Sequence, residues 1–228
     1  LQPDILYLSA STFDEYEILS SRVYAIDLVT KDATVIIDSQ DKDTFMSFIS
    51  ASNGFIVIEN DPPKSESGRY LSLFDLSTNS WVDLPQTYPA SVPDMEYPYI
   101  VWKNNNRFDQ ATNMTIYNIE TGESVARELI GAYSTDPSIS NGYIIAMAST
   151  GEGYFRNSLI LYSLENGDTY AVHVGIDEVG VTDPYIDNGN AIWAFSTLAS
   201  ADNYSSYICK LPLDDLFSNS VEGIEVPQ

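Results

Sequence analysis

Residues 136–165, DPSISNGYIIAMASTGEGYFRNSLILYSLE, decide the fold because related versions of this stretch recur along the chain. The other versions are VPDMEYPYIV at 92–101, DPYIDNGNAIWA at 183–194 and FISASNGFIV at 48–57. Their spacings are 44, 44 and 47 residues when they are aligned on Ile49, Pro93, Pro137 and Pro184. A period in this range is typical of propellers and solenoids, whose repeats pack only on their neighbours.

Each repeat divides into short apolar runs separated by turn residues. The runs in the clearest copy are residues 137–140, 143–149, 158–164 and 169–174. Asn141-Gly142 joins the first two, and this dipeptide is a strong signal for a two-residue hairpin because both of its residues accept a positive φ. Four β runs in about 45 residues, without helical periodicity, predict one four-stranded propeller blade.

The same division extends over the whole chain. It predicts a single all-β domain at 1–228, a β-propeller of about five four-stranded blades. The approximate units are 1–44, 45–91, 92–135, 136–182 and 183–228. Only three β runs occur in the first unit, so we expect its blade to lack the innermost strand. The last unit also departs from the pattern, because LPLDDLFSNS replaces the tight turn before a final run at 221–226.

The turn after the third run of a blade supports this count. It reads Thr-Lys-Asp at 30–32, Thr-Asn-Ser at 78–80, Thr-Gly-Glu at 121–123 and Asn-Gly-Asp at 166–168. Three of the four central residues are Gly or Asn, which suit the left-handed conformation of a short hairpin. Lys31 is the exception and predicts strain or another turn. Tyr97-Pro98 replaces Asn-Gly in the third unit and also requires a different turn.

Composition limits the partners. The chain has 33 acidic and 10 basic residues and a formal net charge of −23, which repels phosphate backbones and argues against nucleic acid. The charge is compatible with bound cations, with a saline exterior or simply with a solvated acidic surface. Cys209 is the only cysteine, which excludes a disulfide framework. No apolar run approaches about 18 residues, so we expect no membrane span.

Two longer phrases carry a family resemblance. YPYIVWKNNN at 97–106 with MTIYNIETGES at 114–124, and DPSISNGYIIAM at 136–147 with LILYSLENGD at 159–168, resemble the TolB-type, WD-repeat-like β-propeller repeats of secreted bacterial and archaeal surface proteins. The pattern covers units two to five and departs from the intracellular WD pattern, because no Gly-His or Trp-Asp pair closes each blade. The resemblance implies the fold and an extracellular or cell-surface location, but propellers host enzymes, lectins and scaffolds alike.

Repeated carboxylates are candidate cation ligands. Asp136 and Asp183 both precede proline at the same repeat position, where a ring of carboxylates at the channel mouth could hold a cation or a sugar. Alternatively, Asp-Pro simply starts the turn into the innermost strand. Phe48 and Val92 occupy the equivalent positions, so any ring is incomplete. With Asp187 these acids predict at most a weakly bound Ca²⁺, because they lack the dense spacing of a dedicated calcium loop. We expect no other cofactor.

No catalytic residues are predicted. Five-bladed glycoside hydrolases that act on furanosides place carboxylates around the channel, and Asp94, Glu96 and Asp187 fall on innermost strands. The strings diagnostic of those enzymes are missing, however, as are G-x-S-x-G, P-loop and H-E-x-x-H motifs. His173, the only histidine, falls on an outermost strand. We therefore expect a protein that is not an enzyme.

Aromatic residues divide by position. Phe74, Tyr117 and Tyr162 occupy one repeated site and are expected to pack between blades, with Trp102 and Trp193 also in the core. Four aromatics near turns or loops are candidate contacts for a ligand or partner: Trp81, Tyr154, Phe155 and Tyr204. Two sequons would accept N-glycans in a glycosylating pathway, at Asn113 and Asn203.

These observations favour a non-enzymatic extracellular or cell-surface module with a structural, scaffolding or adhesive role, whose partner is another protein or a second copy. A carbohydrate-binding, lectin-like propeller is the alternative, and a furanoside-directed hydrolase is the third reading. The first unit offers a vacancy for an innermost strand. Either three strands suffice there, or upstream residues complete the blade, or another chain donates a strand.

Overall fold

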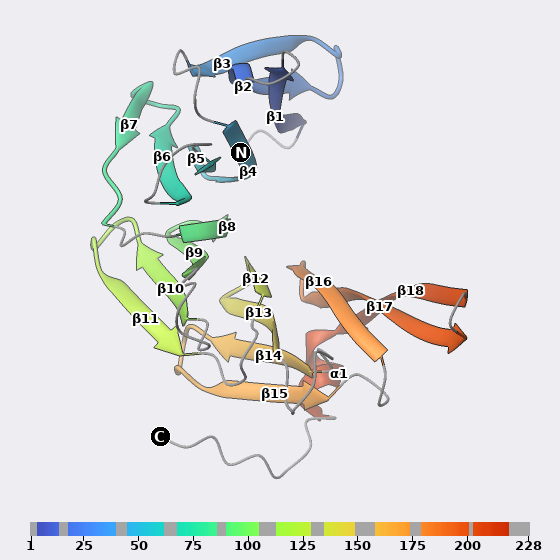
Figure 1. The fold of residues 1–228 in the computed structure, drawn as a ribbon. Helices are drawn as coiled ribbons and strands as arrows, with labels where there is room; N and C mark the ends of the chain where they lie inside the picture. Colours follow the sequence, from blue (N-terminus) through green and yellow to red (C-terminus); the bar gives the residue numbers. More distant parts are fainter. Residues whose placement is uncertain are drawn as a thin grey trace. The chain divides into compact units, whose positions relative to one another are not determined.

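A computed structural model describes residues 4–13, 18–39, 45–61, 68–85, 90–104, 113–128, 135–148, 158–173, 179–200 and 203–218 of the chain. Most of these residues lie in strands, which form five small antiparallel sheets that follow one another along the chain (Figure 1). The sheets are the blades of a β-propeller, which confirms the all-β fold. The structure divides into two compact units, residues 1–105 with 117–124 and residues 106–116 with 125–228.

The first three blades lie at the start of the chain. The first has the order β1-β2-β3, with β1 at Ile5–Phe13, β2 at Ile18–Asp27 and β3 at Ala33–Ser39. The second has the order β4-β5-β6-β7, at Phe45–Ser52, Phe55–Asp61, Tyr70–Asp75 and Ser80–Val82. The third has the order β8-β9-β10-β11, at Ala90–Glu96, Tyr99–Asn104, Asn113–Asn118 and Ser124–Glu128.

The last two blades follow. The fourth has the order β12-β13-β14-β15, at Thr135–Ser140, Tyr143–Ala148, Ser158–Ser163 and Thr169–His173. The fifth has the order β16-β17-β18, at Val179–Asp187, Asn190–Ser200 and Asn203–Pro212, and is followed by the helix α1 at Leu213–Ser218. Among the described residues, no helix is long and apolar enough to cross a membrane.

One backbone hydrogen bond recurs in all five blades and shows which of their strands are equivalent. The amide after the third strand donates to the carbonyl just before the second strand, at 2.7–2.9 Å, in the pairs Leu28–Asp4, Leu76–Gly54, Ile119–Pro98, Leu164–Gly142 and Leu213–Gly189. By this bond β1, β2 and β3 are the second, third and outermost strands of the first blade. Its innermost strand is absent from the described residues, as the sequence predicted.

The fifth blade corrects one expectation. Its three described strands are the innermost, second and third, and α1 begins where the other blades turn toward an outermost strand. The sequence pattern contained no helical period, yet Leu213 and Leu216 are spaced one turn apart and both are buried in the core. Asp214 and Asp215 lie in the first helical turn, where the backbone dipole favours negative charge. The predicted run at 221–226 lies outside the described residues.

The hairpin predictions are confirmed. The pairs Asn53-Gly54, Asn141-Gly142 and Asn188-Gly189 all have positive φ at both residues, as a two-residue hairpin of this kind requires. Tyr97-Pro98 forms a different turn, with a cis peptide bond. At the other end of the blade, Lys31 adopts the left-handed conformation with a φ of 69°, although it has a side chain that disfavours it.

Each described innermost strand also contains a bulge at the same repeat position. The pairing register shifts between Met46 and Ile49, between Ser91 and Asp94, between Thr135 and Ser138, and between Thr182 and Tyr185. Val92 and Asp136 lie at this bulge with φ of 50° and 44°. The expectation that Asp-Pro starts the innermost strand is therefore wrong for Asp136, because the strand is already paired at Thr135 and the aspartate takes up the extra residue of the bulge.

Packing within each unit buries the repeated aromatic site. Phe74, Tyr117 and Tyr162 are all buried, as are Trp102 and Trp193, which confirms their predicted place in the core. In the first unit, one cluster joins the second and third blades and includes Val57, Leu73, Ile100 and Trp102. In the second unit, another joins the fourth and fifth blades and includes Ile145, Leu161, Ile186 and Trp193.

Candidate functional site

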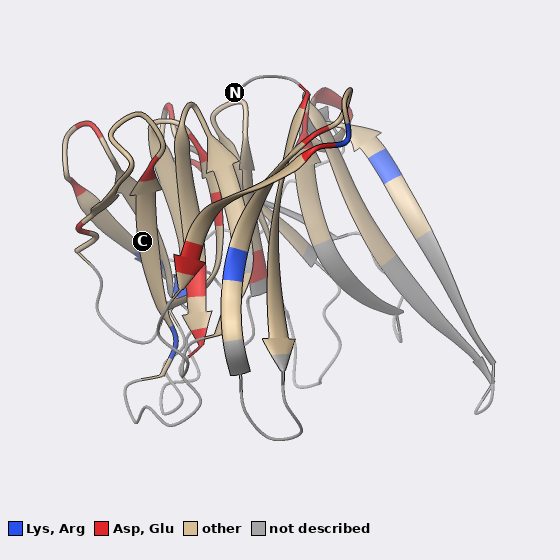
Figure 2. Cartoon of the chain, turned by 90° about the horizontal axis from the view of Figure 1, so that it is seen from above, with Lys and Arg blue, Asp and Glu red and all other residues tan. Residues whose placement is uncertain are grey.

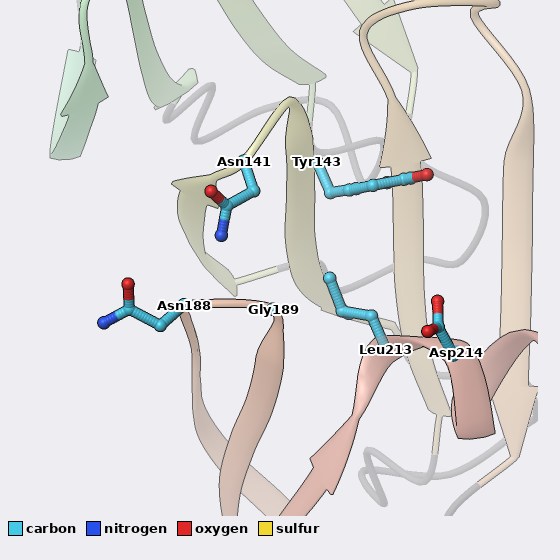
Figure 3. Close-up of a pocket in the computed structure, with 6 residues that line it drawn as sticks. All are labelled: Asn141, Tyr143, Asn188, Gly189, Leu213 and Asp214. Atoms are coloured by element: carbon cyan, nitrogen blue, oxygen red, sulfur yellow. The ribbon is translucent and has the colours of Figure 1, made fainter.

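A hollow of about 420 Å³ opens in the second unit, between the fourth and fifth blades. Figure 3 shows its lining, which comes from two hairpin turns and from the start of α1. The lining residues are Asn141, Tyr143, Asn188, Gly189, Leu213 and Asp214. The hollow exists because the amide of Leu213 donates to the carbonyl of Gly189 at 2.9 Å, which fixes the start of α1 beside the turn between β16 and β17.

The chemistry of this hollow is polar and uncharged apart from one carboxylate. Asn188 is committed to its own turn, because its Nδ2 donates to both carboxylate oxygens of Asp187 at 3.0 Å. Asn141, Tyr143 and Asp214 supply an amide, a phenol and a carboxylate around the buried side chain of Leu213 (Figure 3). These groups can bind a polar ligand by hydrogen bonds.

A second hollow, of about 360 Å³, lies in the first unit between β1 and β4. Its lining combines three hydroxyl and three apolar side chains: Ser9, Ala10, Ser11, Phe45, Met46 and Ser47. The hydroxyl of Ser9 donates to the carbonyl of Ser47 at 2.7 Å and ties the two strands together. We call this hollow the β1–β4 groove.

The first blade carries an exposed apolar face. Leu6 and Leu8 are 48% and 47% exposed, whereas Ile56 and Ile58, the equivalent residues of the second blade, are fully buried. Val35 on β3, which lies on the other side of β2, is exposed as well. In the second blade this position packs toward the blade before it, because Ile56 and Ile58 cluster with Val23 of β2. We call Leu6, Leu8 and Val35 the leading face of the first blade.

A buried glutamate, which the sequence patterns did not reveal, holds the second and third blades together and forms an ion pair with a partly exposed arginine. Glu59 is fully buried, and its carboxylate accepts from the amide of Val92 at 2.6 Å and from the hydroxyl of Ser47 at 3.0 Å. Arg69 Nη1 lies 3.0 Å from the same carboxylate, and Arg69 Nε lies 3.1 Å from Asp61. The one sequence signal was a pair of acids, Glu59 and Asp61, that ends an apolar strand.

The predicted cation ligands do not form a described cluster. Asp136 is half-buried at the bulge of β12, and Asp187 is exposed at the end of β16, where Asn188 occupies its carboxylate. Asp183 lies in β16, but its side chain is outside the described residues. Within the described parts of the chain, no three His, Cys, Asp or Glu side chains are grouped so that they could hold a metal ion.

The other acids of the innermost strands serve packing. Asp94 accepts from the hydroxyl of Ser50 at 2.7 Å and from the amide of Met95 at 2.9 Å, so its carboxylate links the second and third blades. Glu96 ends β8 and is half-buried. His173 is the last residue of β15, the outermost strand of its blade, as predicted.

The candidate contact and glycan residues are placed only in part. Trp81 is 53% exposed and meets the ring of Phe74 edge-on at 5.0 Å. Tyr154 and Phe155 lie outside the described residues. The backbones of Tyr204 and Asn203 lie in β18 and that of Asn113 in β10, but none of these side chains is described. Their roles stay predictions.

The shifted carboxylates belong to turns. Hydrogen bonds from the amides of Thr30 and Val29 lower the pKa of Asp27, and the hydroxyl of Ser77 lowers that of Asp75. Figure 2 shows Asp and Glu at many of the turns between strands, whereas Lys and Arg are few. In the described part of the chain, the acidic side chains therefore lie largely on exposed connections.

Five sheets that share one backbone hydrogen bond, four of them with the same bulge and three with the same Asn-Gly hairpin, define the chain as a β-propeller, and solved structures show that its fold is TolB-like. TolB from Acinetobacter baumannii matches with a TM-score of 0.53 and 13% identity, over 85% of this chain and 52% of that one. The propeller domain of the Trilobed protease from Pyrococcus furiosus matches with a TM-score of 0.57 and 11% identity, over 93% and 80%.

A structure of a nidogen/laminin complex matches with a TM-score of 0.60 and 7% identity, over 94% of this chain and 73% of that one. The chain spans about half the length of TolB. Identities this low show the fold alone. No protein-family description matches the sequence, and no curated protein matches it either.

Proposed function

We propose that this chain is a non-enzymatic β-propeller module that binds a partner protein in an extracellular or cell-surface assembly. The observation that carries the proposal is the leading face of the first blade. Leu6 and Leu8 are about half exposed at positions whose equivalents in the second blade are fully buried. Exposed apolar residues grouped on one face mark interaction sites.

Three further observations support this role. The repeats resemble those of secreted surface proteins, and one similar fold occurs in the structure of a nidogen/laminin complex. The net charge of −23 suits a saline exterior. Two of the three acids on innermost strands that a hydrolase could use are already engaged, since Asp94 accepts from Ser50 and Asp187 accepts from Asn188.

Site-specific cross-linking tests the proposal. A photoactivatable amino acid is placed at Leu8 and, as a matched control, at Val125, an exposed apolar residue on β11. Both proteins are produced in the native host and irradiated. We expect a specific protein adduct at position 8 and none at position 125. The purified partner should then bind at least tenfold more weakly to Leu8→Asp than to Val125→Asp, as measured by calorimetry.

Two results would remove the proposal. One is the absence of an adduct at position 8. The other is equal affinity of the partner for both aspartate variants, which would show that the leading face is not the binding surface.

The hollow lined by Asn141, Tyr143 and Asp214 favours a second candidate, a lectin-like role. Amide, phenol and carboxylate groups around an apolar side chain are typical of carbohydrate sites. A glycan array screened with the wild type and with Asn141→Ala tests it. We expect a glycan that binds the wild type and is lost in the variant; binding that is unchanged in the variant excludes this hollow as the sugar site.

A further inference from the structure

The hollow of about 420 Å³ at the start of α1, which we call the α1 hollow, has a filled counterpart in the first unit between the second and third blades. The backbone hydrogen bond that recurs in all five blades identifies the residues that correspond. They belong to the hairpin turns before the second strands and to the residues after the third strands. The corresponding pairs, with the residue of the first unit named first, are Phe55 and Tyr143, Tyr97 and Asn188, Ile119 and Leu213, and Glu120 and Asp214.

A tyrosine ring fills the counterpart in the first unit. The ring of Tyr97 stacks on that of Phe55, with ring centroids 5.7 Å apart and an angle of 9° between the planes. The hydroxyl of Tyr97 donates to Glu120 Oε1 at 2.9 Å, and this hydrogen bond raises the pKa of the phenol. An aromatic stack and a charge-assisted hydrogen bond therefore hold one phenol between two blades.

The α1 hollow keeps both anchors of that phenol. Tyr143 supplies an aromatic ring, and Asp214 supplies a carboxylate. Tyr143 and Leu213 pack in the core cluster of the second unit. Phe55 and Ile119 pack in the same way against the cluster of the first unit. The two places therefore share an aromatic ring, a branched aliphatic side chain and a carboxylate.

No described side chain fills the α1 hollow as Tyr97 fills its counterpart. Asn188 occupies the position of Tyr97, but its amide donates to the carboxylate of Asp187 at 3.0 Å. Figure 3 shows the side chain of Asn188 directed away from Tyr143 and Asp214. Among the described residues, none donates a hydrogen bond to the carboxylate of Asp214. A space of about 420 Å³ is left, a volume in the range of ligand pockets.

The charge and the walls of the α1 hollow favour a neutral, flat ring that carries a hydroxyl group. The carboxylate of Asp214 repels anions and can accept from a hydroxyl, and a phenol with a pKa of about 10 is neutral at pH 7. A ring without a hydroxyl would leave this carboxylate without a partner. Asn141 and Asn188 are exposed at the rim, so a ring can enter from solvent.

We propose that the α1 hollow binds a para-hydroxyphenyl group, from a tyrosine side chain or a free phenol, which stacks on Tyr143 and donates its hydroxyl to Asp214. The site lies in the second unit and goes beyond the proposed function, which rests on the leading face of the first blade. The lectin-like candidate concerns the same hollow, so a sugar bound there is the competing outcome.

The probe is N-acetyltyrosine amide, and NMR of the isotope-labelled protein reports its binding. We expect a dissociation constant of about 1 mM, because one small ring makes few contacts. The chemical shifts of Tyr143, Leu213 and Asp214 should change. N-acetylphenylalanine amide lacks only the hydroxyl and should bind about tenfold more weakly, because a hydrogen bond to a charged group is not made.

Two pairs of variants assign the contacts. Asp214→Ala should abolish the preference for the tyrosine derivative. Asp215→Ala makes the same change of charge at an exposed neighbour that does not line the hollow, and it should keep the preference. Tyr143→Leu should weaken the binding of both derivatives, whereas Tyr143→Phe keeps a ring, as Phe55 does, and should bind like the wild type. The two derivatives and Asp214→Ala decide the outcome even if Tyr143→Leu does not fold.

A comparison with p-cresol separates the two sources of the ring. The peptide groups of N-acetyltyrosine amide can form hydrogen bonds with the side chain of Asn141, whereas p-cresol has no such groups. Tighter binding of the tyrosine derivative that is lost in Asn141→Ala would assign the hollow to a tyrosine of another protein. Equal binding of the two probes would assign it to a free phenol.

Three results would overturn the inference. These are equal binding of the tyrosine and phenylalanine derivatives to the wild type, an unchanged preference in Asp214→Ala, and the absence of chemical-shift changes at the α1 hollow. Binding of methyl β-glucoside that depends on Asp214, without binding of the tyrosine derivative, would assign the hollow to a sugar instead. The cross-link at Leu8 tests the leading face separately, so loss of this inference would leave the proposed function standing.

Discussion

The carboxylate of Glu59 accepts a hydrogen bond of 2.6 Å from the amide of Val92, which has a φ of 50° at the bulge of β8. A left-handed valine is costly because its branched side chain crowds the backbone. This hydrogen bond therefore joins the buried carboxylate of Glu59 to the strained residue Val92 and holds the third blade against the second. Arg69 Nη1 lies 3.0 Å from the carboxylate and neutralises its charge.

Removal of this carboxylate should destabilise the first unit. We expect Glu59→Ala to lower the free energy of unfolding by about 3 kcal/mol, the lower end of the range for breaking a buried ion pair. The cost lies at the lower end because Arg69 is partly exposed and keeps its ion pair with Asp61. Glu59→Gln, which keeps an acceptor for Val92, should cost less. Urea unfolding of both variants measures the difference. A loss below about 0.5 kcal/mol for the alanine variant would show that the bulge holds without the carboxylate.

The repeated aromatic site should dominate packing in the second unit. Tyr162 is 7% exposed, and Arg127 lies 5.7 Å from the centre of its ring. Tyr162→Ala should cost about 3–5 kcal/mol, as for other buried aromatic residues. Tyr185 of the same unit is 52% exposed, and Tyr185→Ala should cost about 0.5 kcal/mol or less. Equal melting temperatures for the two variants would contradict the assignment of Tyr162 to the core.

Acid should weaken the turn that follows β6. The hydroxyl and amide of Ser77 lower the pKa of Asp75 in the folded state, so its contribution to stability is present above the unfolded pKa of about 4 and is lost as the pH falls through the folded pKa. The Asp75→Asn variant should keep the turn, because Asn118 accepts the equivalent amide hydrogen bonds in the third blade. The variant has no carboxyl group to titrate at this position. The stability difference between wild type and variant should shrink between pH 6 and pH 2. A constant difference across urea titrations would refute the linkage.

Calcium should bind weakly. Asp136 lies at a bulge and Asp187 is paired with Asn188, so these acids and Asp183 do not reproduce the spacing of a dedicated loop. We expect calorimetry to give a dissociation constant of about 10⁻⁴ M or weaker, the range of low-affinity extracellular sites. Asp187→Asn should weaken it further. A sub-micromolar constant, or one unchanged by the substitution, would exclude these ligands.

The sequence alone determined the blades. Apolar alternation, Asn-Gly hairpins such as Asn141-Gly142 and the spacing of Ile49, Pro93, Pro137 and Pro184 are local signals, because strand faces and positive φ depend on neighbouring residues. The three described strands of the first blade and the buried aromatic site of Phe74, Tyr117 and Tyr162 followed from the same repeat register. Even the left-handed Lys31 could be expected from its place in the turn.

Only the tertiary structure decided which residues act across blades. From the sequence alone, Glu59 is expected at the polar end of a strand, and Leu213 and Leu216 are expected in a loop. In the structure, neighbouring elements bury all three side chains. Asp136 is expected in a turn from the sequence, whereas the pairing register of β12 places it at a bulge. Burial and bulges are properties of contacts between distant segments, and a single sequence records only its own local preferences.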